Sequence, residues 1–241
     1  MEEQKDNKTV KKMTKEERKE KKIYSVRKET KWKAFLRCII KNLINGFYHI
    51  VFRIKIVGEP VPKEGAYIIC ANHINYFDAV AVVTSNKRRV YFIAKEDLFH
   101  NGFLNWLAHI FDVIPVKRGK QDLESMKRSL AVLKRGDLLG LFPEGTRKGI
   151  AKNGKIKNGA AFMALRTGVP VIPLGIQGTF KPFKKTILNY GKPLDFSKYQ
   201  SKTPDKEVLE EVSNEIMNNI IMLTNEGKWY IIKGVLNKRL L

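Results

Sequence analysis

Cysteine is scarce in this sequence, and its absence excludes several kinds of site. Cys38 and Cys70 are the only two cysteines among 241 residues. Two cysteines make no disulfide framework, and neither lies in a Cys-x-x-Cys or Cys/His pattern with zinc spacing. Cys70 lies in the apolar run 66–71 and is interpreted as a small buried strand residue. This cysteine usage is typical of a reducing compartment.

Long uncharged apolar runs are also missing. A membrane-spanning helix needs about 20 mostly apolar residues, and the best candidate, 34–54, contains Arg37, Lys41 and Arg53. The N-terminus opens with a long, lysine-rich polar stretch, where a secretory signal would have a short basic head and an apolar core. The sequence therefore indicates neither a clean membrane span nor a signal peptide.

Acidic residues are few relative to basic ones. Aspartate and glutamate number 24 against 46 lysines and arginines, which gives a net charge of +22. Such a field favours nucleic acid, anionic lipid head groups, or a phosphorylated or nucleotide-bearing substrate. The chain has no zinc-finger, RRM or basic-leucine-zipper pattern. We therefore expect no nucleic-acid partner. The alternative from another functional class is a basic membrane- or nucleic-acid-binding protein without catalysis.

The N-terminal part divides into two segments. Residues 1–33 are predicted to be a basic, flexible arm, because they are polar and lysine-rich. An apolar stripe with alternating spacings of three and one follows, and predicts a helix. Its residues are Trp32, Phe35, Leu36, Ile39, Ile40, Leu43, Ile44, Phe47, Tyr48, Val51 and Phe52.

Lysine and arginine lie off this stripe, at Lys33, Arg37 and Lys41. A basic amphipathic helix rich in aromatic residues is typical of a membrane interface, where it lies in the plane of the head groups. The alternative is a helix packed on the domain's own core. We predict a membrane-associating helix over 34–58 and a single main domain over 59–241.

The main domain alternates apolar strands with helical patterns. Strands are expected at 66–71, 90–94, 113–116, 138–142 and 169–174, and helices from 79, at 101–111, 123–133 and 159–167, and from 204. Gly136 and Gly168 are placed to end two of the helices. This alternation predicts an α/β fold, with a mostly parallel sheet flanked by helices. Sites in such sheets gather at the carboxyl ends of strands.

One polar segment, 72–78, follows the strand that ends at Ala71. On a straight helix His73 and Asp78 would point about 140° apart, so they meet only if the chain turns between strand and helix. Asp78 could then accept the Nδ1 proton of His73, and Nε2 would be left as a base for an alcohol. The alternative is a capping aspartate beside a structural histidine.

A second segment, 142–147, follows the strand 138–142. Arg147 could bind phosphate in a bidentate fork, and Gly145 would let a ligand approach the backbone. Glu144 could orient Arg147 or bind a substrate hydroxyl. A solvated turn is the alternative.

These two segments, in this order, resemble the glycerophospholipid acyltransferase family. The first family motif is Asn-His-x4-Asp, which matches Asn72, His73 and Asp78, and the third is Phe-Pro-Glu-Gly-Thr-Arg, which is complete over 142–147. The stretch 113–118 is similar to the second motif, with Arg118 as its arginine, and 169–173 to the fourth. Lys157 begins a Lys-x-Gly step that the family often has. The resemblance covers roughly residues 60 to 190.

The resemblance implies transfer of a fatty acyl chain from acyl-CoA or acyl carrier protein to the free sn-2 hydroxyl of lysophosphatidic acid, giving phosphatidic acid. The main domain would be the acyltransferase domain, with His73 as general base and Asp78 as its orienting carboxylate. The acceptor would be bound by Arg118, Glu144, Gly145, Thr146, Arg147 and Lys157. No metal or other cofactor is implied.

The acceptor could instead be glycerol-3-phosphate or another lysolipid. The small size of the chain favours lysophosphatidic acid. With the basic N-terminal segment, the resemblance predicts a protein attached to an anionic membrane surface, on the cytoplasmic face of the cell membrane.

Overall fold

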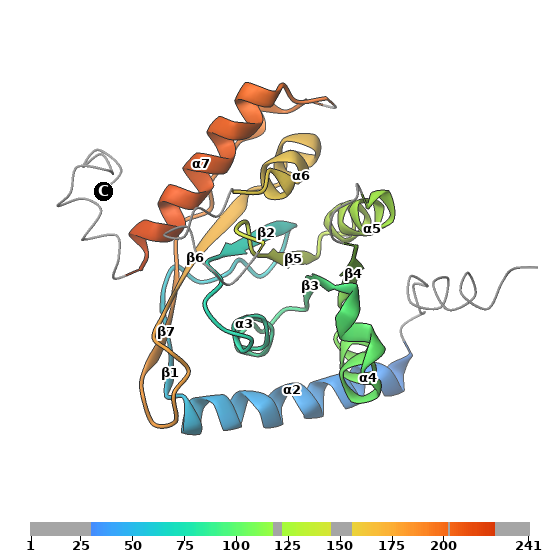
Figure 1. Ribbon diagram of the computed structural model, residues 1–241, viewed down its shortest axis with the longest axis vertical. Coiled ribbons are helices and arrows are strands. Elements are labelled where there is room, and N and C mark those ends of the chain that lie inside the picture. The colour runs from blue at the N-terminus through green and yellow to red at the C-terminus, as the bar shows by residue number, and fades with distance from the viewer. Residues whose placement is uncertain (1–29, 118–121, 146–155, 202, 225–241) are drawn as a thin grey trace, which may run out of the picture.

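A single seven-stranded sheet forms the centre of the molecule (Figure 1). The computed structural model describes residues 30–117, 122–145, 156–201 and 203–224. The strand order is β1-β7-β6-β2-β5-β3-β4, and every neighbouring pair is parallel except β6 and β7. The strands are β1 Ile54–Gly58, β2 Tyr67–Ala71, β3 Val90–Lys95, β4 Ile114–Val116, β5 Leu138–Leu141, β6 Val171–Gln177 and β7 Thr186–Tyr190.

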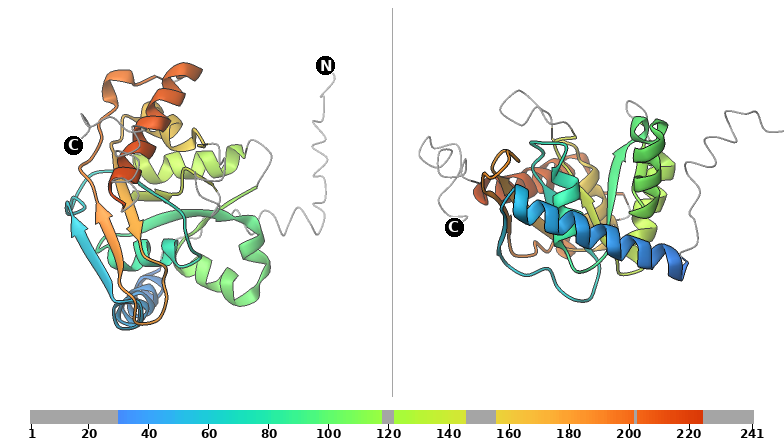
Figure 2. Two further views of the ribbon diagram at one scale, coloured as in Figure 1. Left: turned by 60° about the vertical axis from the view of Figure 1, so that its left-hand side comes forward. Right: turned by 90° about the horizontal axis from the view of Figure 1, so that it is seen from below.

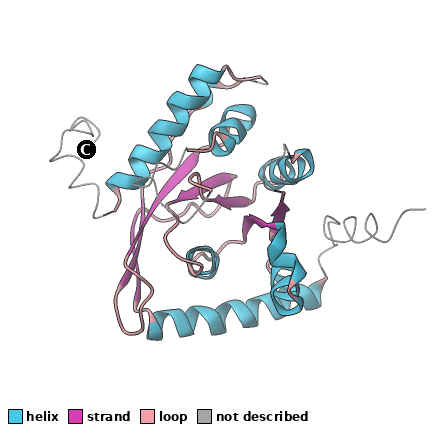
Figure 3. Cartoon of the chain, viewed as in Figure 1, coloured by secondary structure: helices cyan, strands magenta, loops and turns pink. Residues whose placement is uncertain are grey.

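Helices cover both faces of this sheet (Figure 3). They are α2 Lys31–Val51, α3 Asp78–Ser85, α4 Gly102–Ile110, α5 Leu123–Lys134, α6 Gly159–Thr167 and α7 Lys206–Met222, with short 3-10 helices η1 Glu96–His100 and η3 Ser197–Tyr199. Alternate residues of β2 show the two layers, because Ile68 packs with α5, α6 and α7, whereas Ile69 packs with α2 and α3. The predicted α/β fold with a mostly parallel sheet is confirmed.

The helix ends follow local signals in the sequence. Gly168 caps α6 with φ 69°, and Gly136 follows the last residues of α5 with φ 83°. Both glycines adopt the left-handed conformation that ends a helix at little steric cost. One start differs from the prediction, because α7 begins at Lys206 with Asp205 as its N-cap, and Pro204 precedes the cap.

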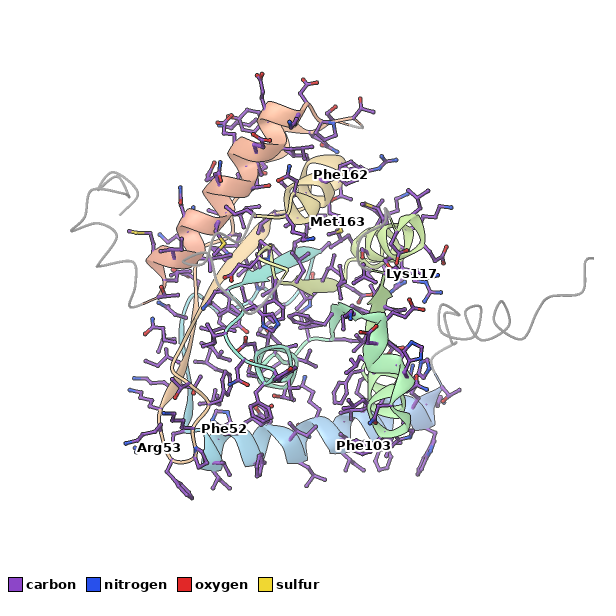
Figure 4. All side chains as sticks on the ribbon, in the orientation of Figure 1. Phe52, Arg53, Phe103, Lys117, Phe162 and Met163 are labelled. Carbon is purple, nitrogen blue, oxygen red and sulfur yellow. The ribbon has the colours of Figure 1, made fainter. Side chains whose placement is uncertain are left out.

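The N-terminal helix is shorter than the sequence suggested. The predicted element 34–58 is helical only to Val51, and residues 54–58 form the edge strand β1, which pairs with β7. Arg53 has φ 43°, and the chain turns sharply there from α2 into β1 (Figure 4). Ile54 and Ile56 are β-branched residues suited to a strand. The prediction was wrong for residues 54–58, because it continued the helix into this β-branched stretch.

Three basic side chains of α2 lie on the side of the helix that faces the domain. Lys33, Arg37 and Arg89 all pair with Asp112, and Arg37 Nη1 lies 2.8 Å from Asp112 Oδ2. The Lys41 ammonium donates to the carbonyl oxygens of Asn86 and Lys87. The sequence places these cations off the apolar stripe of a predicted interfacial helix. They attach the helix to the domain instead.

An apolar stripe of α2 consequently faces outward. Its six members are between 41% and 72% exposed and recur at spacings of three and four residues: Trp32, Phe35, Ile39, Leu43, Phe47 and Ile50. The C-terminal part of the helix also anchors the domain, because Tyr48 and Phe52 pack against Phe77 and Phe180. Figure 2 shows α2 lying across the outside of the molecule. None of the helices in the described ranges combines the length and apolarity needed to cross a bilayer.

Candidate active site

The candidate site lies where two neighbouring parallel strands end. In the register of β2 and β5, Cys70 lies opposite Leu141, so Asn72 and Phe142 begin adjacent loops. The Asn72 side chain also ties this edge to β6, because its Oδ1 accepts the Ile176 N–H at 2.6 Å and its Nδ2 donates to the Ile176 carbonyl at 3.0 Å. The sequence placed Asn72 in a motif but gave no sign of this bridge.

His73 and Asp78 meet across the turn between β2 and α3. The distance from His73 Nδ1 to Asp78 Oδ2 is 2.8 Å. The same oxygen accepts the backbone N–H groups of Ile74 and Asn75, each at 2.7 Å. Asp78 is fully buried at the first residue of α3. The chain therefore turns as this pairing requires.

These contacts assign the tautomer of His73. Because Asp78 Oδ2 already accepts two backbone N–H groups, it acts as a hydrogen-bond acceptor, and the proton of the third contact belongs to Nδ1. Nε2 of the neutral ring then carries the free lone pair. A histidine oriented in this way can take a proton from a hydroxyl.

The ring of His73 is held in place from one side. It stacks on Phe142, with ring centroids 4.0 Å apart and an interplanar angle of 5°. Phe142 in turn contacts Phe92 of β3 at 5.0 Å. The His73 side chain keeps 19% of its surface exposed. Phe142 was predicted as the last residue of a strand and the first of a motif, and its stacking on His73 depends on a strand pairing that local sequence patterns do not reveal.

The turn after β5 brings Glu144 against His73, and Lys157 packs against the same turn. Glu144 is buried, and its Oε1 accepts the His73 backbone N–H at 3.4 Å. Gly145 has φ 62°, and a Cβ there would lie 2.9 Å from the side chain of Lys157. The Lys157 N–H donates to the Pro143 carbonyl at 2.8 Å. Arg118, Thr146 and Arg147, the other predicted substrate-binding residues, lie outside the described residues.

Other chemistry has little support at this site. Cys70 lies two residues before Asn72 but is fully buried, and burial raises the pKa of its thiol, so it is a poor nucleophile. Across the described ranges, no group of three His, Cys, Asp or Glu side chains is placed to hold a metal ion. The groups present suit base catalysis on a substrate that brings its own hydroxyl.

The comparison with known families agrees with this geometry. The family model described as Acyltransferase matches residues 53–177, which extend from just before β1 to the end of β6. The chain belongs to the acyltransferase family. The family resemblance read from the motifs is thus confirmed, and the matched region contains every segment of the candidate site.

Two relatives of this chain are both 1-acyl-sn-glycerol-3-phosphate acyltransferases. The chain is 31% identical over 147 residues to the 1-acyl-sn-glycerol-3-phosphate acyltransferase LPAT1, chloroplastic, of Arabidopsis thaliana, covering 58% of this chain and 41% of that protein. It is 26% identical over 175 residues to the 1-acyl-sn-glycerol-3-phosphate acyltransferase of Bacillus subtilis, covering 70% and 86%. The chain thus spans less than half of the plant relative and most of the bacterial one.

A solved structure shares the fold. The crystal structure of the 1-acyl-sn-glycerophosphate (LPA) acyltransferase PlsC from Thermotoga maritima matches with a TM-score of 0.58 and 23% identity, covering 90% of this chain and 88% of that one. The described part of this chain therefore has the fold of that structure.

Proposed function

We propose that the protein transfers a fatty acyl chain from an acyl thioester to the free sn-2 hydroxyl of lysophosphatidic acid, giving phosphatidic acid. The observation that carries this proposal is the contact between His73 Nδ1 and the buried carboxylate of Asp78. It leaves Nε2 as the basic nitrogen of a partly exposed histidine in a chain of the acyltransferase family. The names of the relatives, 1-acyl-sn-glycerol-3-phosphate acyltransferases, support lysophosphatidic acid as acceptor.

The proposed reaction is a direct transfer. His73 Nε2 takes the proton of the acceptor hydroxyl as the oxygen attacks the thioester carbonyl carbon. The tetrahedral intermediate then collapses, the carbon–sulfur bond breaks, and the thiolate takes the proton from the imidazolium. The Asp78 carboxylate stabilises that imidazolium while it exists. No acyl-enzyme is formed, because the acceptor supplies the nucleophile.

The acceptor's phosphate and glycerol would lie along the loops beyond β4 and β5. We assign their binding to Arg118, Glu144, Gly145, Thr146 and Arg147, and also to Lys157. Among these, Glu144, Gly145 and Lys157 lie next to His73 or to the turn that contacts it. A backbone N–H that donates to the oxyanion would complete the site.

The test of this function is thiol release from acyl-CoA by the purified full chain in detergent. Release that depends on added lysophosphatidic acid is expected. Glycerol-3-phosphate as acceptor and acyl carrier protein as donor form the comparison arms. Faster thiol release with glycerol-3-phosphate than with lysophosphatidic acid would identify glycerol-3-phosphate as the acceptor. Faster transfer from acyl carrier protein than from acyl-CoA would identify acyl carrier protein as the donor. Folded protein that is inactive in every arm would refute the proposal.

Arg147→Ala is expected to raise the acceptor's KM. Loss of a charged hydrogen bond to phosphate costs about 1.5–3 kcal/mol, which corresponds to roughly a 10- to 150-fold increase in KM. Steady-state kinetics with lysophosphatidic acid as the varied substrate measure it, and Arg166→Ala, on α6, serves as the control. A KM equal to that of the unaltered protein would remove Arg147 from the phosphate site.

We further propose that the protein works at an anionic membrane surface, on the cytoplasmic face of the cell membrane. Two lipid substrates must reach His73, and the outward apolar stripe of α2 suits insertion at the boundary between head groups and acyl chains. The net charge of +22 favours an anionic surface. The predicted basic arm, 1–33, lies outside the described residues up to position 29.

Leu43→Asp should weaken binding to vesicles. Leu43 is 69% exposed on the α2 stripe, whereas Leu123, on α5 across the sheet, is 65% exposed. Burying a leucine in the bilayer contributes about 1.5–3 kcal/mol, so the partition constant should fall by roughly 10- to 150-fold. Cosedimentation with phosphatidylcholine vesicles measures this apolar effect without a net lipid charge.

Leu123→Asp is the matched control and should bind as the unaltered protein does. A point substitution is preferable to deletion of 1–54, because Tyr48, Phe52 and Ile54 belong to the core. Equal binding by the two variants would show that the α2 stripe does not enter the membrane.

A further inference from the structure

An exposed basic segment connects β6 and β7 at the C-terminal end of α2 (Figure 1). We call its residues, 178–185, the basic turn. It contains Lys181, Lys184 and Lys185 and no aspartate or glutamate. Positions 181–185 are all exposed, and none of the three lysines forms an ion pair with another residue that the structure describes. Such a cluster of like charges favours an anionic partner.

The two phenylalanines of the basic turn differ in burial. Phe180 is buried, and its ring centroid lies 5.6 Å from that of Phe52. Phe183 is 69% exposed. Both have a left-handed backbone conformation, with φ 48° and φ 61°, which is unfavourable for a bulky residue. The packing of Phe180 offsets that cost, whereas Phe183 keeps most of its ring surface open to a partner.

Hydrogen bonds attach the basic turn to the end of α2. The Phe183 N–H donates to the Val51 carbonyl at 2.6 Å, and the Thr186 N–H, directly after the turn, donates to the Phe52 carbonyl at 3.1 Å. Carbonyl groups of the last helical turn point out of the end of a helix. Phe183 therefore lies beyond the end of α2, where the exposed stripe ends at Ile50. The turn reaches the same edge of the molecule as α2 (Figure 1).

Two contacts join the basic turn to the candidate active site. Phe180 contacts Phe77, which directly precedes α3, with ring centroids 6.0 Å apart. Strand β6 leads into the turn, and its Ile176 is tied to Asn72, the residue before His73. The turn is therefore on the part of the molecule that carries the catalytic segment. A membrane contact there would hold His73 close to the surface from which lipid substrates come.

A lipid surface and an acidic protein, such as acyl carrier protein, both suit a basic turn. The contacts favour the lipid surface. The turn continues the edge along which the apolar α2 stripe lies, and its exposed phenylalanine has lysines on both sides in the chain (Figure 1). An aromatic ring suits the boundary between head groups and acyl chains, and lysines beside it can reach the lipid phosphates.

We propose that the basic turn is a contact for anionic phospholipid. Phe183 enters the boundary region beside the α2 stripe, and Lys181, Lys184 and Lys185 bind the lipid phosphates. This inference rests on the proposed function, in which the stripe lies on a membrane. It adds a set of residues that select anionic lipid, which an uncharged stripe does not do. It also brings the catalytic end of α2 to the membrane.

Lys184→Gln combined with Lys185→Gln should weaken binding to anionic vesicles. Each lysine at a surface of anionic lipid raises the partition constant by about fivefold. The double variant of the full chain should therefore bind vesicles of phosphatidylcholine mixed with phosphatidylglycerol roughly 25-fold less tightly. Cosedimentation measures this binding. On vesicles of phosphatidylcholine alone, the variant should bind as the unaltered protein does.

Lys127→Gln combined with Lys134→Gln is the matched control. Both lysines are exposed on α5, away from the edge of the molecule that carries α2 (Figure 1). This variant has the same net charge as the turn variant and should bind both kinds of vesicle as the unaltered protein does. Thiol release in detergent should be unchanged in both double variants, because none of the four lysines lies at the candidate active site.

Phe183→Ala should weaken binding to both kinds of vesicle by about tenfold. This is the lower end of the range for burying an aromatic side chain, because part of the ring is already covered in the protein. Equal loss on charged and uncharged vesicles would separate the apolar contact of Phe183 from the charge contact of the lysines. Binding as tight as that of the unaltered protein would remove Phe183 from the contact.

Equal binding of the anionic vesicles by the two double variants would overturn the proposal, as would a lack of preference for anionic vesicles in the unaltered protein. If the turn variant kept its vesicle binding but lost thiol release from acyl carrier protein in detergent, the turn would be a docking site for that acidic protein. Leu43→Asp on phosphatidylcholine vesicles tests the α2 stripe separately, so failure of the stripe is distinguished from failure of the basic turn.

Discussion

His73→Ala should lower kcat for acyl transfer by about 10²- to 10⁴-fold, the usual contribution of a positioned general base. In the unaltered protein, Asp78 and Phe142 hold the imidazole, and Nε2 is its basic nitrogen. Alanine leaves no group there to take the hydroxyl proton. The loss should appear in kcat under saturating lysophosphatidic acid, measured as thiol release from acyl-CoA.

His100→Ala is the matched control, because His100 is an exposed histidine on η1. It should retain full activity. Because alanine at position 73 also removes the ring from its stack on Phe142, circular dichroism must show that the variant is folded. If folded His73→Ala transfers acyl chains at the rate of the control, the general-base assignment is wrong.

The sequence predicted those features that local rules determine. Glycine ended α5 and α6 as expected, because a left-handed cap depends on a few neighbouring residues. The alternation of strands and helices predicted the sheet, and the ends of β2 and β5 predicted the site. The contact between His73 and Asp78 was predicted only on the condition that the chain turns between strand and helix, and the structure has that turn.

Features that depend on distant partners could not be predicted. The spacing of apolar residues predicted a stripe on α2. Which side of the helix faces the domain depends on contacts such as that between Arg37 and Asp112, which lies 75 residues further along the chain. Asn72 is joined to Ile176 across 104 residues. The stacking of His73 on Phe142 follows from the β2–β5 register. Such contacts arise from tertiary packing, which a local pattern does not contain.

The orientation of α2 also changes the role assigned to its basic side chains. In the sequence, the basic residues off its stripe are typical of an interfacial helix, and Lys33, Arg37 and Lys41 in fact contact the domain. The membrane proposal therefore rests on the exposed apolar stripe, which faces outward because the basic side of the helix contacts the domain.

Asp78→Asn should lower both kcat and stability. An asparagine can take two orientations at this position. In one, its NH₂ group faces the three donors that Asp78 Oδ2 accepts, which is repulsive. In the other, its oxygen faces those donors and its NH₂ group is buried at the position of Asp78 Oδ1. That oxygen is buried and has no hydrogen-bond partner among the described residues. Leaving a buried donor unpaired costs about 1–3 kcal/mol. The neutral amide also stabilises the His73 imidazolium less than a carboxylate does.

We therefore expect kcat to fall by at least about 10²-fold, within the range for a disabled general base, and the free energy of unfolding to fall by about 1–3 kcal/mol. Urea unfolding and thiol release from acyl-CoA measure the two effects on the same preparation. Asp97→Asn is the control, because the Asp97 side chain is 65% exposed. The two readouts separate the roles of Asp78. If stability falls while kcat stays at the control value, Asp78 is a capping residue beside a structural histidine, and the proposed orientation of His73 has no part in the chemistry.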